Sequence, residues 1–90
     1  MIIRLLYFAS ARTALGGVSS EEIELAVSTK LKELSSILLD RHAGVRQELA
    51  AVLGQSAWCV NEEIVPRDEE AQHELKPGDT VAVIPPVSGG

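Results

Sequence analysis

The sequence predicts an α+β fold in which a mixed sheet of about five strands packs on one main helix and one short helix. Short runs of β-branched, aromatic and leucine residues alternate with clusters of turn residues, and helical periodicity is confined to the middle of the chain. The elements therefore follow the order strand, strand, helix, strand, short strand, strand. Because one helix cannot cover both faces of a sheet, we expect one packed face and one open face.

The first two strands are predicted at residues 2–8 and 22–27. In the second, alternation places Ile23, Leu25 and Val27 on one face and polar residues on the other. The glycine and serine residues between the two runs favour a hairpin connection.

The main helix is predicted to follow Ser28 or Thr29, either of which would serve as its N-cap. An apolar stripe at helical spacing supports it, formed by Leu31, Leu34, Ile37 and Leu38. A second, shorter helix is predicted over residues 45–53 and ends at Gly54.

Three further strands complete the pattern. Residues 57–60 and 80–84 have strand composition, and residues 64–66 predict a short edge strand because Pro66 lacks the N–H that a central strand requires. A mixed sheet that grasps a helix in this order is the β-grasp, or ubiquitin-like, architecture. We therefore expect a β-grasp domain at residues 1–84 and a flexible C-terminal tail at residues 85–90.

Length and charge limit the classes of partner. The chain has 90 residues, enough for one domain with one modest core, and a net charge of −5. An acidic domain repels nucleic acid and anionic membranes, so a basic protein is the expected partner. The single cysteine, Cys59, forms no internal disulfide, and the sequence has neither a good signal peptide nor a membrane-spanning run. The cytosol is the expected location.

Few side chains suggest chemistry of their own. Cys59 has no second cysteine at redox spacing, so a buried or sheet-face position is expected for it. His42 and His73 lack ligand spacing with other donors, which predicts no metal site. Trp58 is expected in the core, and the acidic run at residues 68–70 is expected to be a solvated loop.

The C-terminus carries the strongest functional signal. Two prolines, Pro85 and Pro86, end the last strand, and Val87, Ser88, Gly89 and Gly90 follow. The six residues reach at most about 20 Å when extended. A slim tail without terminal side chains suits an enclosed enzyme site that activates the α-carboxylate, since glycine allows close backbone approach.

The open face of the sheet is the predicted docking surface. Strand alternation places Phe8 and Ile84 on the side away from the helix, and Ile64 lies just past the neighbouring turn. Exposed apolar residues that cluster in this way usually mark a partner site.

The two ends of the chain resemble the small, sulfur-carrying subunits of molybdopterin synthase (the MoaD family). At the C-terminus the similarity covers residues 78–90, and at the N-terminus it covers Leu6-Tyr7-Phe8-Ala9 with Arg12 and Gly16. Asn61 at the mid-chain turn also matches. The helical region supports the fold without indicating a family.

This resemblance implies a carrier rather than a self-contained enzyme. A ubiquitin-activating-like adenylyltransferase and sulfurtransferase would use ATP to adenylate Gly90 and convert it to a thiocarboxylate. The tail would then enter the large subunit of molybdopterin synthase, within a heterotetramer, and donate sulfur to cyclic pyranopterin monophosphate. The resemblance places the large-subunit contact at Phe8, Ile64 and Ile84, and it implies no bound cofactor.

Three alternatives remain open at this point. The first is a sulfur carrier for thiamine synthesis or tRNA thiolation. The second is a protein modifier that forms an isopeptide bond through Gly90, and the third is a binding module with an inert tail. The Pro-Pro pair favours the molybdopterin interpretation over the first two.

Overall fold

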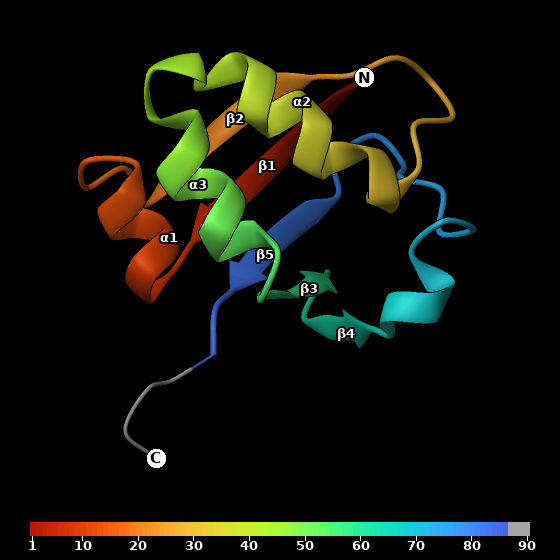
Figure 1. Ribbon diagram of the computed structural model, residues 1–90. Helices are drawn as coiled ribbons and strands as arrows, with labels where there is room; N and C mark the ends of the chain where they lie inside the picture. Colours follow the sequence, from red (N-terminus) through yellow and green to blue (C-terminus); the bar gives the residue numbers. More distant parts are fainter. Residues whose placement is uncertain (87–90) are drawn as a thin grey trace.

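Five strands form one mixed sheet in the computed structural model, which describes residues 1–86 of the chain (Figure 1). The strands lie in the order β2-β1-β5-β3-β4, with β1 and β5 parallel and the other neighbours antiparallel. Their bounds are β1 Ile2–Tyr7, β2 Ser20–Glu24, β3 Ala57–Val60, β4 Glu63–Val65 and β5 Thr80–Ile84. The predicted mixed sheet and the short edge strand are confirmed, and Pro66 lies just outside β4.

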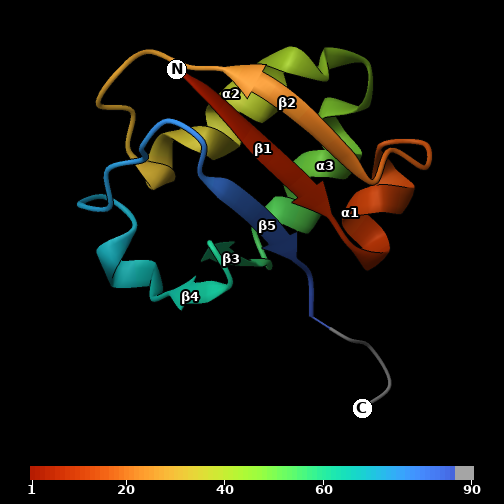
Figure 2. The same ribbon diagram turned by 180° about the vertical axis from the view of Figure 1, so that it is seen from behind.

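Three α-helices lie against one face of this sheet. They are α1 Ala9–Ala14, α2 Leu34–Arg41 and α3 Arg46–Leu53, and short 3-10 turns occupy Leu31–Glu33, Ala43–Val45 and Arg67–Glu69. No helix formed by residues 1–86 lies on the opposite face, as the view from behind shows (Figure 2). The predicted packed face and open face are therefore present. The helical layer differs in detail, since α2 and α3 are equal in length and α1 was not predicted.

The core lies between the helices and the inner face of the sheet. Alternate residues of β1 and β5 point into it, and α2 and α3 each contribute two leucines. Its fully or nearly fully buried members include Ile3, Leu5, Tyr7, Leu34, Leu38, Leu49, Leu53, Trp58, Val81 and Val83. The apolar faces predicted for the first and last strands and for both helices are confirmed, as is the core position of Trp58.

The second strand is shorter than predicted. It ends at Glu24, and Val27 is 78% exposed in the following loop, so the prediction that Val27 shares a face with Ile23 and Leu25 is wrong. Pairing with β1 ends at Ile2 opposite Glu24, and Leu25 still donates its N–H to the carbonyl oxygen of Met1. A turn follows, in which the N–H of Thr29 donates to the carbonyl oxygen of Ala26 at 3.3 Å, and Val27 lies within it.

The predicted helix caps are also wrong. Ser28 adopts a left-handed backbone with φ +74°, and the hydroxyl of Thr29 donates to the carbonyl oxygen of Ala26 at 2.7 Å. The 3-10 turn at Leu31–Glu33 instead follows Lys30, whose backbone N–H donates to Glu33 Oε2 at 2.7 Å. The serine and threonine therefore shape the preceding turn and do not start the helix.

Candidate functional site

The chain leaves the domain at the C-terminal end of β5, in the middle of the sheet. Because β1 and β5 are parallel, with Tyr7 opposite Val83, both strands end at the same edge (Figure 1). Pro85 is buried and Pro86 is exposed. The predicted site residues Val87, Ser88, Gly89 and Gly90 lie outside the described residues, so their roles stay predictions.

Phe8 lies between β1 and α1, as the N-cap residue of α1, so the predicted first strand is one residue too long. Its backbone is still extended, with φ −118° and ψ 154°. The alternation of β1 therefore continues through it and directs its ring to the open face. Phe8 is 48% exposed, so about half of this side chain has no cover within the domain.

Apolar side chains from four strands gather on the open face around this exit. Antiparallel and parallel pairing aligns Leu6 with Ala82, Ala82 with Cys59 and Cys59 with Ile64, while Ala57 lies opposite Ile84. We call this set the outer patch; it comprises Leu6, Phe8, Ala57, Cys59, Ile64, Ala82 and Ile84. The structure thus brings the three predicted interface residues onto one face.

Two of these predicted residues are strongly exposed for their type. Ile64 is 68% exposed and Ile84 is 39% exposed. The same face is polar further from the tail, where Arg4 lies opposite Glu22 and Thr80. The apolar half of the open face is therefore the half from which the tail leaves.

Leu6, Ala57 and Ala82 were not predicted as part of the docking surface. Leu6 and Ala82 follow from the same alternation that selects Phe8 and Ile84, so the sequence contains their signal. Ala57 becomes visible only once β3 is known to pair with β5.

Cys59 sits inside this patch but is 7% exposed, because its neighbours on the face cover it. Its strand partners Ala82 and Ile64 flank it on either side. The expectation of a buried or sheet-face cysteine is confirmed. A thiol covered in this way acts as a small apolar side chain.

Asn61 fixes the turn that presents Ile64. Its φ of +51° lies in the left-handed region, which asparagine tolerates better than most residues. Its side-chain amide donates to Asp79 Oδ1 at 2.9 Å, and its side-chain oxygen accepts the N–H of Thr80 at 3.0 Å. The β3–β4 turn is thereby tied to the start of β5, which sets where β4 lies.

A charged cluster joins β2 to the end of α2, on the helix side of the sheet. Glu21 accepts hydrogen bonds from Tyr7 at 2.5 Å and from Arg41 at 2.8 Å, and its Oε2 lies 2.7 Å from His42 Nε2. Burial alone would raise the pKa of Glu21, but the hydrogen bonds from Tyr7, His42 and Arg41 outweigh it and lower that pKa. Burial, reinforced by the adjacent carboxylate, raises the pKa of Tyr7.

This cluster gives His42 a structural role that sequence reasoning missed. Glu21 shares the inner face of β2 with Ile23, and this alternation is the sequence signal that could have found it. The pairing with α2 could not have been found, because 20 residues separate Glu21 from Arg41.

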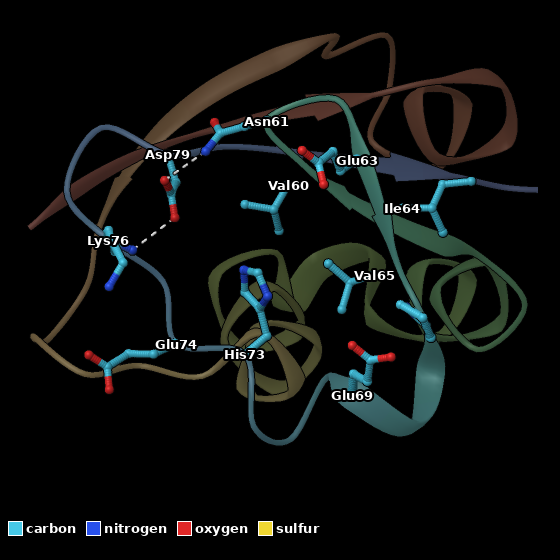
Figure 3. Close-up of a pocket in the computed structure, with 11 residues that line it drawn as sticks. Val60, Asn61, Glu63, Ile64, Val65, Glu69, His73, Glu74, Lys76 and Asp79 are labelled. Atoms are coloured by element: carbon cyan, nitrogen blue, oxygen red, sulfur yellow. Dashed lines mark hydrogen bonds between the residues drawn. The ribbon is translucent and has the colours of Figure 1, made fainter.

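A cavity of about 380 Å³ lies between the β3–β4 hairpin and the loop that precedes β5 (Figure 3). His73 points into it, Val60 and Val65 form apolar wall, and Glu63 and Glu69 lie at its rim. Asp79 is held by Asn61 and by the backbone N–H of Lys76 at 2.8 Å. The cavity joins acidic and apolar groups without placing a nucleophile beside a base.

Neither a metal-binding cluster nor a membrane-spanning helix is found in the part of the chain that the structure describes. Within residues 1–86, no three histidine, cysteine or acidic side chains are grouped so as to hold a metal ion. The helices of that part are all too short or too polar to cross a bilayer. The features that remain are a tail root and an apolar surface beside it.

Comparison with known sequences gives consistent matches along the whole chain. The model of the ThiS family matches residues 5–90. A molybdopterin synthase sulfur carrier subunit from Mycosarcoma maydis is 39% identical over 89 residues, which cover 98% of this chain and 92% of the relative. The protein of the same name from Chlamydomonas reinhardtii is 37% identical, and the alignment covers 100% of both chains.

Solved structures agree with the sequence matches. A Pyrococcus furiosus protein assigned as molybdopterin converting factor subunit 1 is 33% identical, with a TM-score of 0.72 over 97% of this chain and 99% of its own. A chain in the complex of subunits 1 and 2 of molybdopterin-converting factor from Helicobacter pylori is 26% identical, with a TM-score of 0.68 and full coverage of both chains. On its β-grasp fold and these full-length matches, the chain belongs to the ThiS family of ubiquitin-like sulfur carriers.

Proposed function

We propose that this chain is the sulfur carrier subunit of molybdopterin synthase and works through the α-carboxylate of Gly90. One arrangement supports the proposal most: the chain leaves the central strand β5 through Pro85 and Pro86 beside the outer patch, and Val-Ser-Gly-Gly follow in the sequence. The relatives from M. maydis and C. reinhardtii carry the name of this subunit, and the H. pylori structure is a complex with a second subunit.

The chemistry begins with activation of the carboxylate, which is a poor electrophile on its own. A ubiquitin-activating-like enzyme adenylates Gly90 with ATP and releases pyrophosphate. Hydrosulfide, or a donor sulfur at the same oxidation level, then attacks the acyl adenylate and displaces AMP, which leaves a thiocarboxylate. ATP is used by that enzyme, and the carrier itself holds no cofactor.

The second half of the cycle takes place in the large subunit, which supplies the catalytic side chains. The thiocarboxylate of Gly90 gives its sulfur to cyclic pyranopterin monophosphate, and the carboxylate is restored after the thioester-type intermediate is hydrolysed. Two such transfers build one dithiolene. The carrier contributes position: the outer patch docks, and the tail delivers the sulfur into the enclosed site.

The outer patch suits this role because an apolar surface without an internal partner favours protein association. Phe8, Ile64 and Ile84 are the proposed centre of the contact with the large subunit. The acidic character of the chain, with net charge −5, favours basic surroundings on the partner.

Reconstitution of dithiolene synthesis tests the proposal. Thiocarboxylated chain, large subunit and cyclic pyranopterin monophosphate are mixed, and the dithiolene product is measured after oxidation to a fluorescent pterin. Product should form in proportion to the thiocarboxylate supplied. A chain that lacks Gly90 withdraws the carboxylate by about 3.3–3.6 Å and should give no product, although it binds the large subunit. Equal product from both chains would refute the carrier role.

A further inference from the structure

A groove of about 530 Å³ lies at the root of the tail, on the helix side of the sheet. It runs between the start of α1 and the end of α3, which lie side by side next to the point where the chain leaves β5 (Figures 1 and 2). Its walls include Ala9, Ala51, Val52, Gln55, Pro85 and Pro86.

The lining of this groove suits packing and not chemistry. Alanine, valine and proline side chains dominate it, and its polar members are Ser10 and Gln55. No charged residue of the described chain lines it. Its volume far exceeds the share of about 30 Å³ that a single water molecule takes in the liquid. An apolar side chain therefore fits it better than an ion or a polar ligand.

The length of the tail determines what must approach this groove. Four residues follow Pro86 in the sequence, and they span at most about 13–14 Å when extended. A protein that encloses the carboxylate of Gly90 must therefore bring the mouth of its site within that distance of Pro86. A site mouth that lies this close to Pro86 would also contact the surface around it.

Two surfaces flank the tail root, and only one of them is the outer patch. Phe8 and Ile84 lie on the open-face side, and the groove lies on the helix side. They adjoin where Phe8 is followed by Ala9. Ala9 has a φ of +49°, a conformation that is unfavourable for a residue with a Cβ. This backbone conformation turns the chain abruptly between the outer patch and the groove.

We propose that the groove is a second docking site, which receives an apolar side chain from the large subunit of molybdopterin synthase. The proposal rests on the proposed function, since it assumes that the large subunit encloses the tail. The large subunit then grips the carrier on both sides of the tail root, which fixes the direction in which the tail enters. Contacts on both sides orient the reactive carboxylate and also increase the affinity of the complex.

Two neighbouring alanines of α3 provide a matched pair of variants. Both Ala50 and Ala51 are exposed, but Ala51 lines the groove, whereas Ala50 lines a separate hollow with Arg46 and Gln47. Ala51→Glu and Ala50→Glu introduce the same charge into the same helix. The dissociation constant for the purified large subunit is measured by calorimetry, with a melting curve for each variant.

Ala51→Glu should weaken binding about tenfold or more, because a carboxylate would be buried in an apolar contact. Ala50→Glu should stay within about twofold of wild type, as a surface substitution away from the contact does. If Ala51→Glu does not fold, Gln55→Glu provides the same test at an exposed position of the groove with little change of shape. Gln55→Glu should also raise the dissociation constant for the large subunit.

Affinity of Ala51→Glu equal to that of Ala50→Glu would overturn the proposal. The proposal would also be overturned if Ala51→Glu impaired only thiocarboxylate formation, because the groove would then serve the activating enzyme. It would equally be overturned if Ala51→Glu impaired only self-association, because the groove would then bind a second copy of the chain. The proposed function has a separate test in Phe8→Arg. If Phe8→Arg weakens binding to the large subunit and Ala51→Glu does not, only the groove proposal fails. If the wild-type chain does not bind the large subunit at all, the proposed function fails as well.

Discussion

Replacement of Phe8 by arginine should weaken the complex with the large subunit while the domain stays folded. The ring lies on the open face at the root of the tail and is 48% exposed. An arginine at this position keeps an aliphatic stem that covers the half of the site now packed against the domain. Its charge would be placed at the centre of the outer patch, where the contact would have to exclude water.

The exposed area of the ring sets the expected magnitude. A phenylalanine side chain has about 200 Å² to bury, so at 48% exposure about 100 Å² of Phe8 is left for a partner to cover. At about 25 cal/mol per Å², this area corresponds to about 2.5 kcal/mol, or roughly a 50-fold increase in the dissociation constant. Desolvation of the guanidinium adds to this loss.

Calorimetric titration with the large subunit measures the effect, and Val27→Arg is its control. Val27 is 78% exposed, more than Phe8, but it lies in the loop after β2, away from the tail. Val27→Arg should bind as wild type does, and both variants should melt at the wild-type temperature. Unchanged affinity of a folded Phe8→Arg protein would refute the assignment of the outer patch as the docking surface.

Three other substitutions test the core, the charged cluster and the tail. Leu34 is fully buried, so Leu34→Ala should lower the free energy of unfolding by about 2–5 kcal/mol in denaturant titration, and a loss below about 0.5 kcal/mol would contradict its place in the core. Because the pKa of Glu21 is lowered by folding, its contribution is present above the ordinary carboxyl pKa of about 4.3 and is lost as the pH falls through the lowered value. Glu21→Gln should therefore reduce stability at neutral pH and flatten its decline in acid, and an unchanged pH profile would exclude this role. Gly89→Val should abolish thiocarboxylate formation by blocking entry of the tail, with an unchanged melting temperature; a normal yield by mass spectrometry would show that the enclosing site is wide.

The strands were the part of the fold that sequence reasoning predicted best. Residues 57–60 and 80–84 have strand composition between clusters of turn residues, and β3 and β5 match the predicted bounds. The helix α1 was missed because it spans only six residues and buries a single one of them, Ala11, which leaves no apolar stripe to detect. Local patterns are informative only where an element is long enough to repeat them.

The errors arose where the hydrogen-bond partner that a group finds decides the local structure, and residue type does not reveal that partner. Val27 continues the pattern of Ile23 and Leu25, but it lies in the turn that the N–H of Thr29 closes onto the carbonyl oxygen of Ala26. Thr29 is a good N-cap by type, yet its hydroxyl is engaged by Ala26. A single sequence shows residue type and spacing, and it does not show which partner a group will find.

Part of the candidate site could likewise be predicted from the sequence, and part of it could not. Phe8, Ile64 and Ile84 followed from alternation and turn position, and the structure places them on one face. The groove at the tail root could not be predicted, because α1, α3 and β5 are far apart in the sequence and meet only in the folded domain. Gly89 and Gly90 lie outside the described residues, so their function depends on chemistry that must be measured.

The most direct measurement is the intact mass of the chain isolated from its own cells, with and without the large subunit. Without the large subunit, sulfur on the carrier is not consumed, so a form with one oxygen replaced by sulfur should accumulate, and fragmentation should place that sulfur on Gly90. A chain that lacks Gly90 should show only the unmodified carboxylate. If wild type remains entirely unmodified in cells without the large subunit, or if the shortened chain acquires sulfur equally, the carrier function is contradicted.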